Sequence, residues 1–303
     1  MNLQNKPKLS IYRIEKTFRG SDLRKIFYMF KWKLTGQKHP DQFSESHPCV
    51  FALSTGRVGS ETMTHILKKS GNALVYHEPL PELFGLSKKA YELFPGYLGD
   101  EKMKCLLMEG FLTARRALFN HALYCDRGYI EAGPPATFLA PVIYEAIPQV
   151  KFIHLIRDPM SVVRSALRRK WYSGHPYDPT RIIPLPDSQF RESWDDFSPI
   201  EKNCWLWAET NRWIHQFLQG LPADRSITLH SEDVFSADPQ AIHLLFAFIN
   251  QPTPSKQALD RILRMRFNAQ ETGTGVDHLD ENALREPLRS FFYQMAADFG
   301  YSL

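Results

Sequence analysis

Short apolar runs alternate with segments of helical periodicity along most of the chain. Each run is bounded by polar or turn-forming residues and is typical of a strand buried in a sheet. The runs are CVFALS (49–54), ALVYH (73–77), YIEA (129–132), KFIHLI (151–156) and SITLHSEDV (226–234).

The segments between these runs have the spacing of helices, and three of them carry a clear start signal. Asp158, Ser198 and Asp238 are each followed by proline, the pattern of an N-cap residue before the first helical position. Strands alternating with helices predict an α/β fold: a single domain with a parallel sheet of about four to five strands, flanked by helices, with ligands at the carboxyl ends of the strands. We expect helices in 60–70, 79–128 with loops, 136–147, 159–171, 198–220, 239–250, 261–266 and a last segment ending at Phe299.

Two segments stand outside this alternation. Residues 173–197 are rich in Pro, Asp and Ser without a regular period, and a long loop in a compact domain is usually functional, so we interpret it as a candidate lid. Residues 21–34 place apolar side chains on one helical face and most Lys and Arg off it. That basic amphipathic helix fits either packing on the domain or peripheral contact with a membrane or an anionic substrate.

Composition and charge narrow the function classes. The 303 residues are 43% hydrophobic and 23% charged, as in ordinary globular proteins. The net charge of +4 comes from residues 1–48, which hold ten Lys or Arg against four Asp or Glu, whereas residues 49–303 hold 27 against 29. We interpret 1–48 as a basic N-terminal extension and 49–303 as the functional domain, whose slightly acidic balance argues against nucleic acid as a partner.

The cysteines and the apolar stretches bear on the cellular setting. Cys49, Cys105, Cys125 and Cys204 are far apart and form no CxxC pair, which argues against a disulfide framework and a zinc site. No stretch approaches the roughly 18 apolar residues of a membrane span, and the first residues lack the pattern of a secretion signal. We therefore expect a cytoplasmic protein without a metal.

A glycine-containing loop follows the first predicted strand, with the sequence STGRVGSET (54–62). In a strand, glycine loop and helix, backbone N–H groups and the positive helix end converge on an anion. Ser60 and Thr62 add hydroxyl donors, and Arg57 adds a permanent cation. The loop lacks the lysine of a Walker A motif, and turns of this kind also occur without a ligand.

A second anion-binding pattern follows the strand 151–156. Arg157 ends this strand beside the helix start at Asp158, and Ser165 lies about two turns into that helix. An arginine in this position is suited to bidentate phosphate binding, although a surface pair of Arg157 with Asp158 is the alternative. Together the two patterns predict a ligand with anionic groups at two separated places.

The segments STGRVGSET (54–62) and FIHLIRDPMSVVRSALRR (152–169) resemble the two nucleotide-binding motifs of the sulfotransferase family. This family uses 3′-phosphoadenosine 5′-phosphosulfate (PAPS) as the donor and releases 3′-phosphoadenosine 5′-phosphate (PAP). The resemblance extends from about Cys49 to the C-terminus and implies the P-loop-like sulfotransferase fold. It is closer to carbohydrate- and tyrosine-acting and bacterial members than to cytosolic small-molecule enzymes, whose catalytic histidine motif is absent.

The resemblance also implies roles for single residues. Arg157 and Ser165 would hold the 3′-phosphate. Glu61 departs from the family, which usually has a small hydroxyl residue there, so we expect its carboxylate to point away from the sulfate. The residues implied to hold the 5′-phosphosulfate are Arg57, Val58, Gly59, Ser60, Glu61 and Thr62.

In-line sulfuryl transfer requires a group that stabilises the leaving oxygen and a base that removes the acceptor's proton. Arg57 is the candidate for the first role, because a guanidinium stays charged at neutral pH. Glu78 is the first candidate for the base, because Tyr76-His77-Glu78-Pro79 resembles the acid–proline segment of carbohydrate- and tyrosine-acting sulfotransferases. His77, whose ordinary pKa suits a base better, is the alternative.

Other polar residues have roles that the sequence leaves open. Glu131, near the end of the third predicted strand, fits acceptor binding, orientation of Arg57, or a buried hydrogen-bonding carboxylate equally well. The basic cluster Arg164, Arg168, Arg169 and Lys170 fits either a solvated helix face or attraction of an anionic ligand.

The sequence thus predicts an enzyme that transfers the sulfuryl group of PAPS to an acceptor hydroxyl, with a saccharide or glycolipid as the acceptor and a carboxylate as the base. Two alternatives remain open at this stage. One is a kinase or NTPase of related fold, and the other is a nucleotide- or glycan-binding module without catalysis.

Overall fold

The computed structural model describes residues 38–265 and 284–303. Its centre is a five-stranded sheet in the order β2-β3-β1-β4-β5, in which all strand pairs are parallel. The strands are β1 (Cys49–Leu53), β2 (Ala73–His77), β3 (Gly128–Ala132), β4 (Lys151–Ile156) and β5 (Ser226–His230). The predicted α/β fold with a parallel sheet is therefore confirmed.

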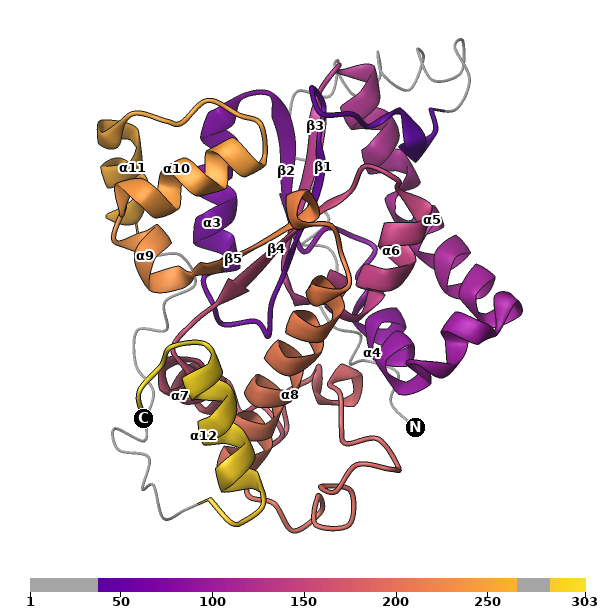
Figure 1. Cartoon of the computed structure of the whole chain (residues 1–303), viewed down its shortest axis with the longest axis vertical. Coiled ribbons are helices and arrows are strands. Elements are labelled where there is room, and N and C mark those ends of the chain that lie inside the picture. The colour runs from indigo at the N-terminus through magenta and orange to yellow at the C-terminus, as the bar shows by residue number, and fades with distance from the viewer. Residues whose placement is uncertain (1–37, 266–283) are drawn as a thin grey trace, which may run out of the picture.

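Helices cover both faces of this sheet (Figure 1). On one side lie α3 (Ser60–Leu67), α9 (Ser231–Phe235), α10 (Pro239–Phe248) and α11 (Lys256–Leu263). On the other side lie α4 (Phe84–Leu93), α5 (Glu101–Tyr124) and α6 (Ala140–Ala146). The helices α7 (Pro159–Arg168) and α12 (Leu288–Asp298) pack against α8 (Pro199–Gln219).

The alternation of side chains along the strands divides the core in two. In β1, Phe51 and Leu53 pack with the apolar face of α5, whereas Val50 and Ala52 pack with α3 and α10. Successive residues of a strand point to opposite faces, so a strand buried on both faces must be apolar throughout. This is why the strands appear in the sequence as continuous apolar runs.

Several element boundaries differ from the prediction, and three of them are informative. The run 226–234 is a strand only to His230, and α9 begins at Ser231, because Glu232 and Asp233 favour the first turn of a helix. The helix α7 ends at Arg168, and Lys170 and Tyr172 beyond it have positive φ. The helix predicted at 261–266 is α11, which starts at Lys256 because Ser255 caps it.

Some expectations fall outside the described residues. These are the amphipathic helix at 21–34 and the last residue of the helix predicted at 261–266. The four cysteines lie in the described part of the chain and are free. No helix formed by the described residues has the length and apolar character needed to cross a membrane.

Candidate functional site

A cleft of about 680 Å³ opens at the carboxyl ends of the strands. After β1 the chain runs toward the β2 edge of the sheet, and after β4 it runs toward the opposite edge, at β5. The cleft lies between the loops that follow β1 and β4. Parallel α/β sheets bind ligands at such a switch point, because the loops on the two sides diverge and leave a crevice. Both predicted anion-binding motifs contribute residues to its wall.

The loop between β1 and α3 presents the start of α3 to the cleft. Gly56, Arg57 and Gly59 all have positive φ, of 83°, 62° and 87°. Gly59 is the N-cap residue of α3, and no side chain caps the helix from this position. The first N–H groups of a helix have no partner within the helix, so this helix start can bind an anion in the cleft.

Arg57 joins this loop to the second motif. Its Nε donates a hydrogen bond to Ser165 Oγ at 2.9 Å, and its carbonyl oxygen accepts one from Arg157 Nη1 at 3.1 Å. Burial lowers the pKa of Arg57 to about 10, and the positive charge of Arg169 acts in the same direction, so the guanidinium is still charged at neutral pH. Residues about 100 positions apart in the sequence thus form one contiguous cationic wall.

The second motif is fixed by its own hydrogen bonds. The Asp158 carboxylate accepts from Ser161 N at 2.7 Å and caps α7, as its sequence pattern predicts. The Trp207 indole of α8 donates to the Arg157 carbonyl at 3.0 Å. These bonds hold the backbone of Arg157 while its guanidinium extends to the β1–α3 loop.

His77 and Glu78 lie in the same cleft, at the end of β2. The His77 Nε2 atom is 2.9 Å from Ser60 Oγ, in hydrogen-bond contact, and 3.9 Å from Glu78 Oε1. Glu78 has a φ of 43°, and a Cβ on Gly133 would lie 2.8 Å from Glu78 Cγ. Gly133 therefore provides the space that the Glu78 side chain occupies. The structure brings the two candidate bases, His77 and Glu78, next to the loop between β1 and α3, which we call the anion loop.

Glu131 does not line the cleft. It is 1% exposed, and its carboxylate accepts from Arg115 Nε at 2.6 Å, from Arg115 Nη2 at 2.7 Å and from the Tyr129 hydroxyl at 2.6 Å. Of the three roles left open by the sequence, the buried hydrogen-bonding carboxylate describes this placement. Acceptor binding and orientation of Arg57 do not fit it, because β3 directs the side chain toward α5.

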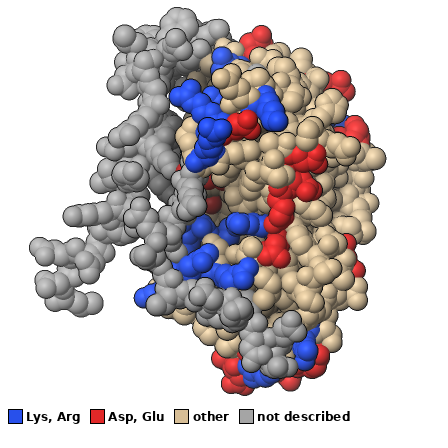
Figure 2. Space-filling view, turned by 90° about the vertical axis from the view of Figure 1, so that its left-hand side faces the viewer, with Lys and Arg blue, Asp and Glu red and all other residues tan. Residues whose placement is uncertain are grey.

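The remaining predicted residues separate into those at the cleft and those outside it. Glu61 and Thr62 are among its lining residues, and this position of Glu61 does not support the expectation that it points away from the anion. In the basic cluster, Arg168 and Arg169 line the cleft, whereas Arg164 and Lys170 are not among its lining residues. Figure 2 shows Lys and Arg side chains gathered around a hollow on one face of the molecule.

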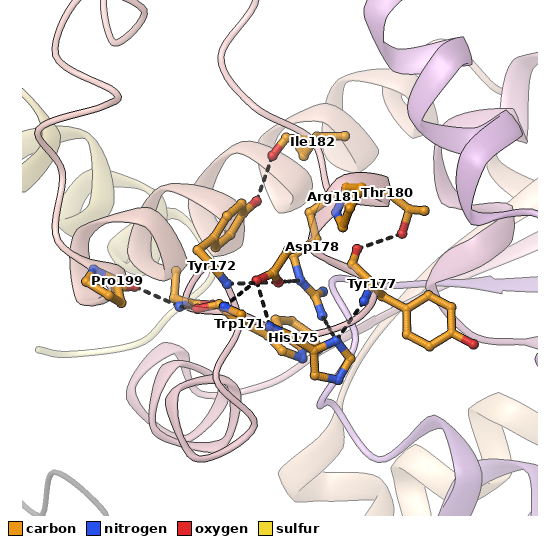
Figure 3. A network of polar contacts seen from close by, with 12 residues as sticks. Trp171, Tyr172, His175, Tyr177, Asp178, Thr180, Arg181, Ile182 and Pro199 are labelled. Atoms are coloured by element: carbon orange, nitrogen blue, oxygen red, sulfur yellow. Dashed lines mark hydrogen bonds and ion pairs between the residues drawn. The ribbon is translucent and has the colours of Figure 1, made fainter. Parts of the chain in front are cut away.

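The segment after α7 forms a further wall that sequence reasoning located only as a candidate lid. The Asp178 carboxylate accepts from the backbone N–H groups of Tyr172, Gly174 and His175 and from Arg181 Nε (Figure 3). The Arg181 guanidinium lies 3.7 Å from the centre of the Trp171 ring. This segment contributes four residues to the wall of the cleft: Trp171, His175, Tyr177 and Arg181. The sequence signals that mark this wall are the tryptophan after the basic cluster and the Asp178-Pro179 pair.

Trp171 connects this wall to the anion loop. A Cβ on Gly56 would lie 3.1 Å from Trp171 Cη2, so the ring packs directly on the glycine. Trp194, the other tryptophan near the candidate lid, is buried instead, with its ring 5.0 Å from that of Trp205. The candidate lid, residues 173–197, is therefore held against the rest of the domain by the packing of Trp171, just before it, and of Trp194, near its end.

No protein-family model and no curated protein sequence matches the chain. Solved structures do resemble it. The sulfotransferase domain of the olefin synthase from Synechococcus PCC 7002 is 18% identical with a TM-score of 0.51, and the match covers 88% of this chain and 100% of that domain. Sulfotransferase STF9 from Mycobacterium avium is 10% identical with a TM-score of 0.52, over 92% of this chain and 83% of that protein. The chain therefore has the α/β fold of these sulfotransferase structures.

Proposed function

We propose that the protein transfers the sulfuryl group of PAPS to an acceptor hydroxyl. The observation that carries this proposal is the contact between the two anion-binding motifs, through Arg57, Ser165 and Arg157, in one cleft beside the uncapped start of α3. The shared fold supports it independently.

The donor's two anionic ends match the two parts of this wall. The start of α3, with Ser60 and Thr62, would hold the 5′-phosphosulfate, and Arg157 with Ser165 would hold the 3′-phosphate. Arg57 donates to Ser165 through Nε alone, and because a guanidinium carries five N–H donors, its terminal nitrogens can still donate to the leaving oxygen.

In the transfer step, the acceptor oxygen forms a bond to sulfur while the bond between sulfur and the 5′-phosphate oxygen breaks. The acceptor's proton passes to the Glu78 carboxylate, and the negative charge that develops on the leaving oxygen is stabilised by Arg57 and the N–H groups of α3. PAP then leaves with the bridging oxygen. Alignment of the reactants by the fixed walls of the cleft supplies much of the rate acceleration.

The acceptor class is part of the same proposal. The segment Tyr76-His77-Glu78-Pro79, by its resemblance to carbohydrate- and tyrosine-acting sulfotransferases, favours a saccharide or glycolipid. A cytoplasmic location and function without a metal complete the proposal.

Ligand-dependent thermal unfolding distinguishes a sulfotransferase from a kinase or NTPase. We expect PAP to raise the melting temperature more than ATP with magnesium does, because at equal concentration the ligand that binds the folded state more tightly stabilises it more. A larger shift with ATP and magnesium would overturn the proposal. Release of PAP from PAPS that depends on an added hydroxyl acceptor would exclude a purely binding module.

A further inference from the structure

The wall of the cleft that follows α7 holds a histidine whose proton position the structure fixes. We call the residues Trp171, His175, Tyr177 and Arg181 the lid wall. The Tyr177 backbone N–H donates to His175 Nδ1 at 3.2 Å, and Arg181 Nη2 lies 3.3 Å from the same atom (Figure 3). A backbone N–H and a guanidinium only donate, so Nδ1 accepts both bonds and carries no proton. The proton of the neutral ring is therefore on Nε2.

His175 presents this Nε2–H group to the cleft. Burial lowers the pKa of His175, and the positive charge of Arg181 acts in the same direction more strongly than Asp178 opposes it, so the ring is neutral at pH 7. Nε2 makes no hydrogen bond to the described residues and is not one of their buried unpaired atoms. Because the half-buried side chain lines the cleft and its Nδ1 is turned to the protein, Nε2 is left as a donor for a ligand.

Asp178 and Trp171 hold this donor in one orientation. The Asp178 carboxylate accepts from the His175 backbone N–H at 2.9 Å and from Arg181 Nε at 3.0 Å. The Arg181 guanidinium also lies 3.7 Å from the centre of the Trp171 ring. Both the backbone of His175 and the guanidinium that contacts its ring are thus fixed before a ligand binds, as in a preorganised donor.

The lid wall adjoins the part of the anion loop that lies beside the candidate base. A Cβ on Gly56 would lie 3.1 Å from Trp171 Cη2 and 3.4 Å from Pro134 Cγ. Pro134 directly follows Gly133, against which the Glu78 side chain packs. The lid wall and Glu78 therefore flank the same stretch of the anion loop, where the proposed function holds the sulfuryl group.

The charges around His175 suit an anionic oxygen. Arg181, Arg169 and Arg57 all act to lower its pKa, so their positive charges lie near its ring. An oxygen with negative charge gains from this field and from a directed N–H donor. A general base would have to offer a lone pair to the acceptor instead, so His175 in this state does not compete with Glu78 for that role.

We propose that His175 is a further catalytic residue, which donates a hydrogen bond from Nε2 to an oxygen of the sulfuryl group as that group passes from PAPS to the acceptor. This rests on the proposed function and adds a residue to it. His175 gains and loses no proton in the step, because the bond that breaks joins sulfur to the 5′-phosphate oxygen and the acceptor's proton passes to Glu78.

A comparison of PAPS with PAP tests this contact, because PAP lacks the sulfuryl group. In His175→Asn the amide oxygen takes the place of Nδ1 as acceptor, while the donor at Nε2 is lost. We expect this variant to bind PAPS about tenfold more weakly in the absence of an acceptor and to bind PAP with unchanged affinity, both measured by calorimetry. His175→Gln, whose amide nitrogen reaches the position of Nε2, should recover part of the loss. His215→Asn, on α8 and outside the lining of the cleft, should change neither affinity.

The other outcomes overturn the proposal in distinct ways. Equal weakening of PAPS and PAP would place His175 at the nucleotide, and unchanged PAPS affinity with a raised KM for the acceptor would place it at the acceptor. Unchanged donor and acceptor parameters with a lower melting temperature would make its role structural. NMR of the ring nitrogens needs no variant, and a proton on His175 Nδ1 would also overturn the proposal. Failure of the unmodified protein to bind PAPS would instead overturn the sulfotransferase assignment.

Discussion

At the scale of single residues, the two candidate bases have different surroundings. His77 is in hydrogen-bond contact with Ser60 in the first turn of α3, so its ring is engaged with the anion loop. Glu78 has its backbone in the left-handed region, which is uncommon for a residue with a side chain and is often found at functional sites. These placements favour Glu78 as the base and His77 as a group that positions Ser60.

Replacement of Glu78 by glutamine removes the base and keeps the size of the side chain. We expect Glu78→Gln to lower the turnover of PAPS by about 10²–10⁴-fold, the usual contribution of a general base. The affinity for PAP, measured by calorimetry, should change little, because Glu78 is not among the groups proposed to hold the nucleotide.

The matched comparison is His77→Gln, which removes the contact with Ser60. This variant should weaken PAP binding more than it lowers the maximal rate. If Glu78→Gln turned over at a near-normal rate while His77→Gln did not, the assignment of the base would be reversed.

The buried pair of Arg115 and Glu131 permits a prediction about stability. Both side chains are almost fully buried, and two hydrogen bonds of 2.6 and 2.7 Å join them. We expect Arg115→Leu to lower the free energy of unfolding by about 3–5 kcal/mol, because it leaves the Glu131 carboxylate buried without its counterion. Urea unfolding measures this loss.

Two variants make that experiment discriminating. The double variant Arg115→Leu with Glu131→Leu should recover much of the lost stability, since it removes both charges. Lys89→Ala, which breaks the exposed pair of Lys89 and Glu92, should cost at most about 1 kcal/mol. A loss in Arg115→Leu no larger than in Lys89→Ala would show that the buried pair is unimportant.

At the scale of elements, the geometry of the β1–α3 loop depends on Gly59. A Cβ at this position would lie 2.3 Å from a ring carbon of Phe235, the last residue of α9. Gly59 also has a φ of 87°, which disfavours any residue with a side chain. A side chain at residue 59 would therefore strain the backbone before α3 and would require the Phe235 ring to move.

Gly71 offers a control for Gly59 because it has the same backbone conformation without the close contact. Its φ is 78°, and a Cβ there would meet nothing within 4 Å. We expect Gly71→Ala to cost about 1 kcal/mol of stability and to leave PAP affinity unchanged. Gly59→Ala should destabilise more and should weaken PAP binding at least about tenfold, measured by calorimetry; equal effects of the two variants would contradict this prediction.

The strands and most helices were predictable because their signals are local. A strand buried on both faces is apolar at every position, and helix starts such as Asp158-Pro159 carry their own cap. Glu131 could not be assigned, because its partner Arg115 lies on α5 and no spacing rule connects the two.

The walls of the cleft depend on contacts that sequence periodicity does not encode. Asp178 orders its segment through the backbone N–H groups of Tyr172, Gly174 and His175, which form no repeating pattern. The two anion-binding patterns were therefore predictable from the sequence, whereas the wall formed by Trp171, His175, Tyr177 and Arg181 required the structure.

At the scale of the whole molecule, β4, the neighbour of the central strand β1, contributes side chains to both cores. Ile153 and Leu155 belong to one core and Phe152 to the other. His154 is 0% exposed and lies between the aromatic ring of Phe299, with centroids 5.4 Å apart, and Asn211 of α8. A titratable ring thus occupies the region where the strands, α8 and the C-terminal segment meet.

His154 should make the stability of the whole protein sensitive to acid. Burial lowers the pKa of His154 from 6.5 to about 4, and the hydrogen bond with Asn211 opposes this only in part. The Asn211 amide nitrogen donates to the Trp207 carbonyl at 2.8 Å, so its oxygen faces His154 Nε2 at 2.9 Å and accepts from it. His154 Nδ1 has no partner among the described residues, so a proton added there would be buried and unpaired.

The sign of the effect follows from proton uptake in the two states. Between about pH 6.5 and pH 4 the unfolded chain binds a proton at His154 that the folded protein does not, so stability falls as the pH is lowered through this range, by up to about 3 kcal/mol. Urea unfolding at a series of pH values should show this slope in the unmodified protein and a smaller one in His154→Phe. His39→Gln, which removes a mainly exposed imidazole, should keep the full slope. If His154→Phe also kept the full slope, the acid sensitivity would belong to other groups, and protonation of His154 would not limit the stability of the sheet.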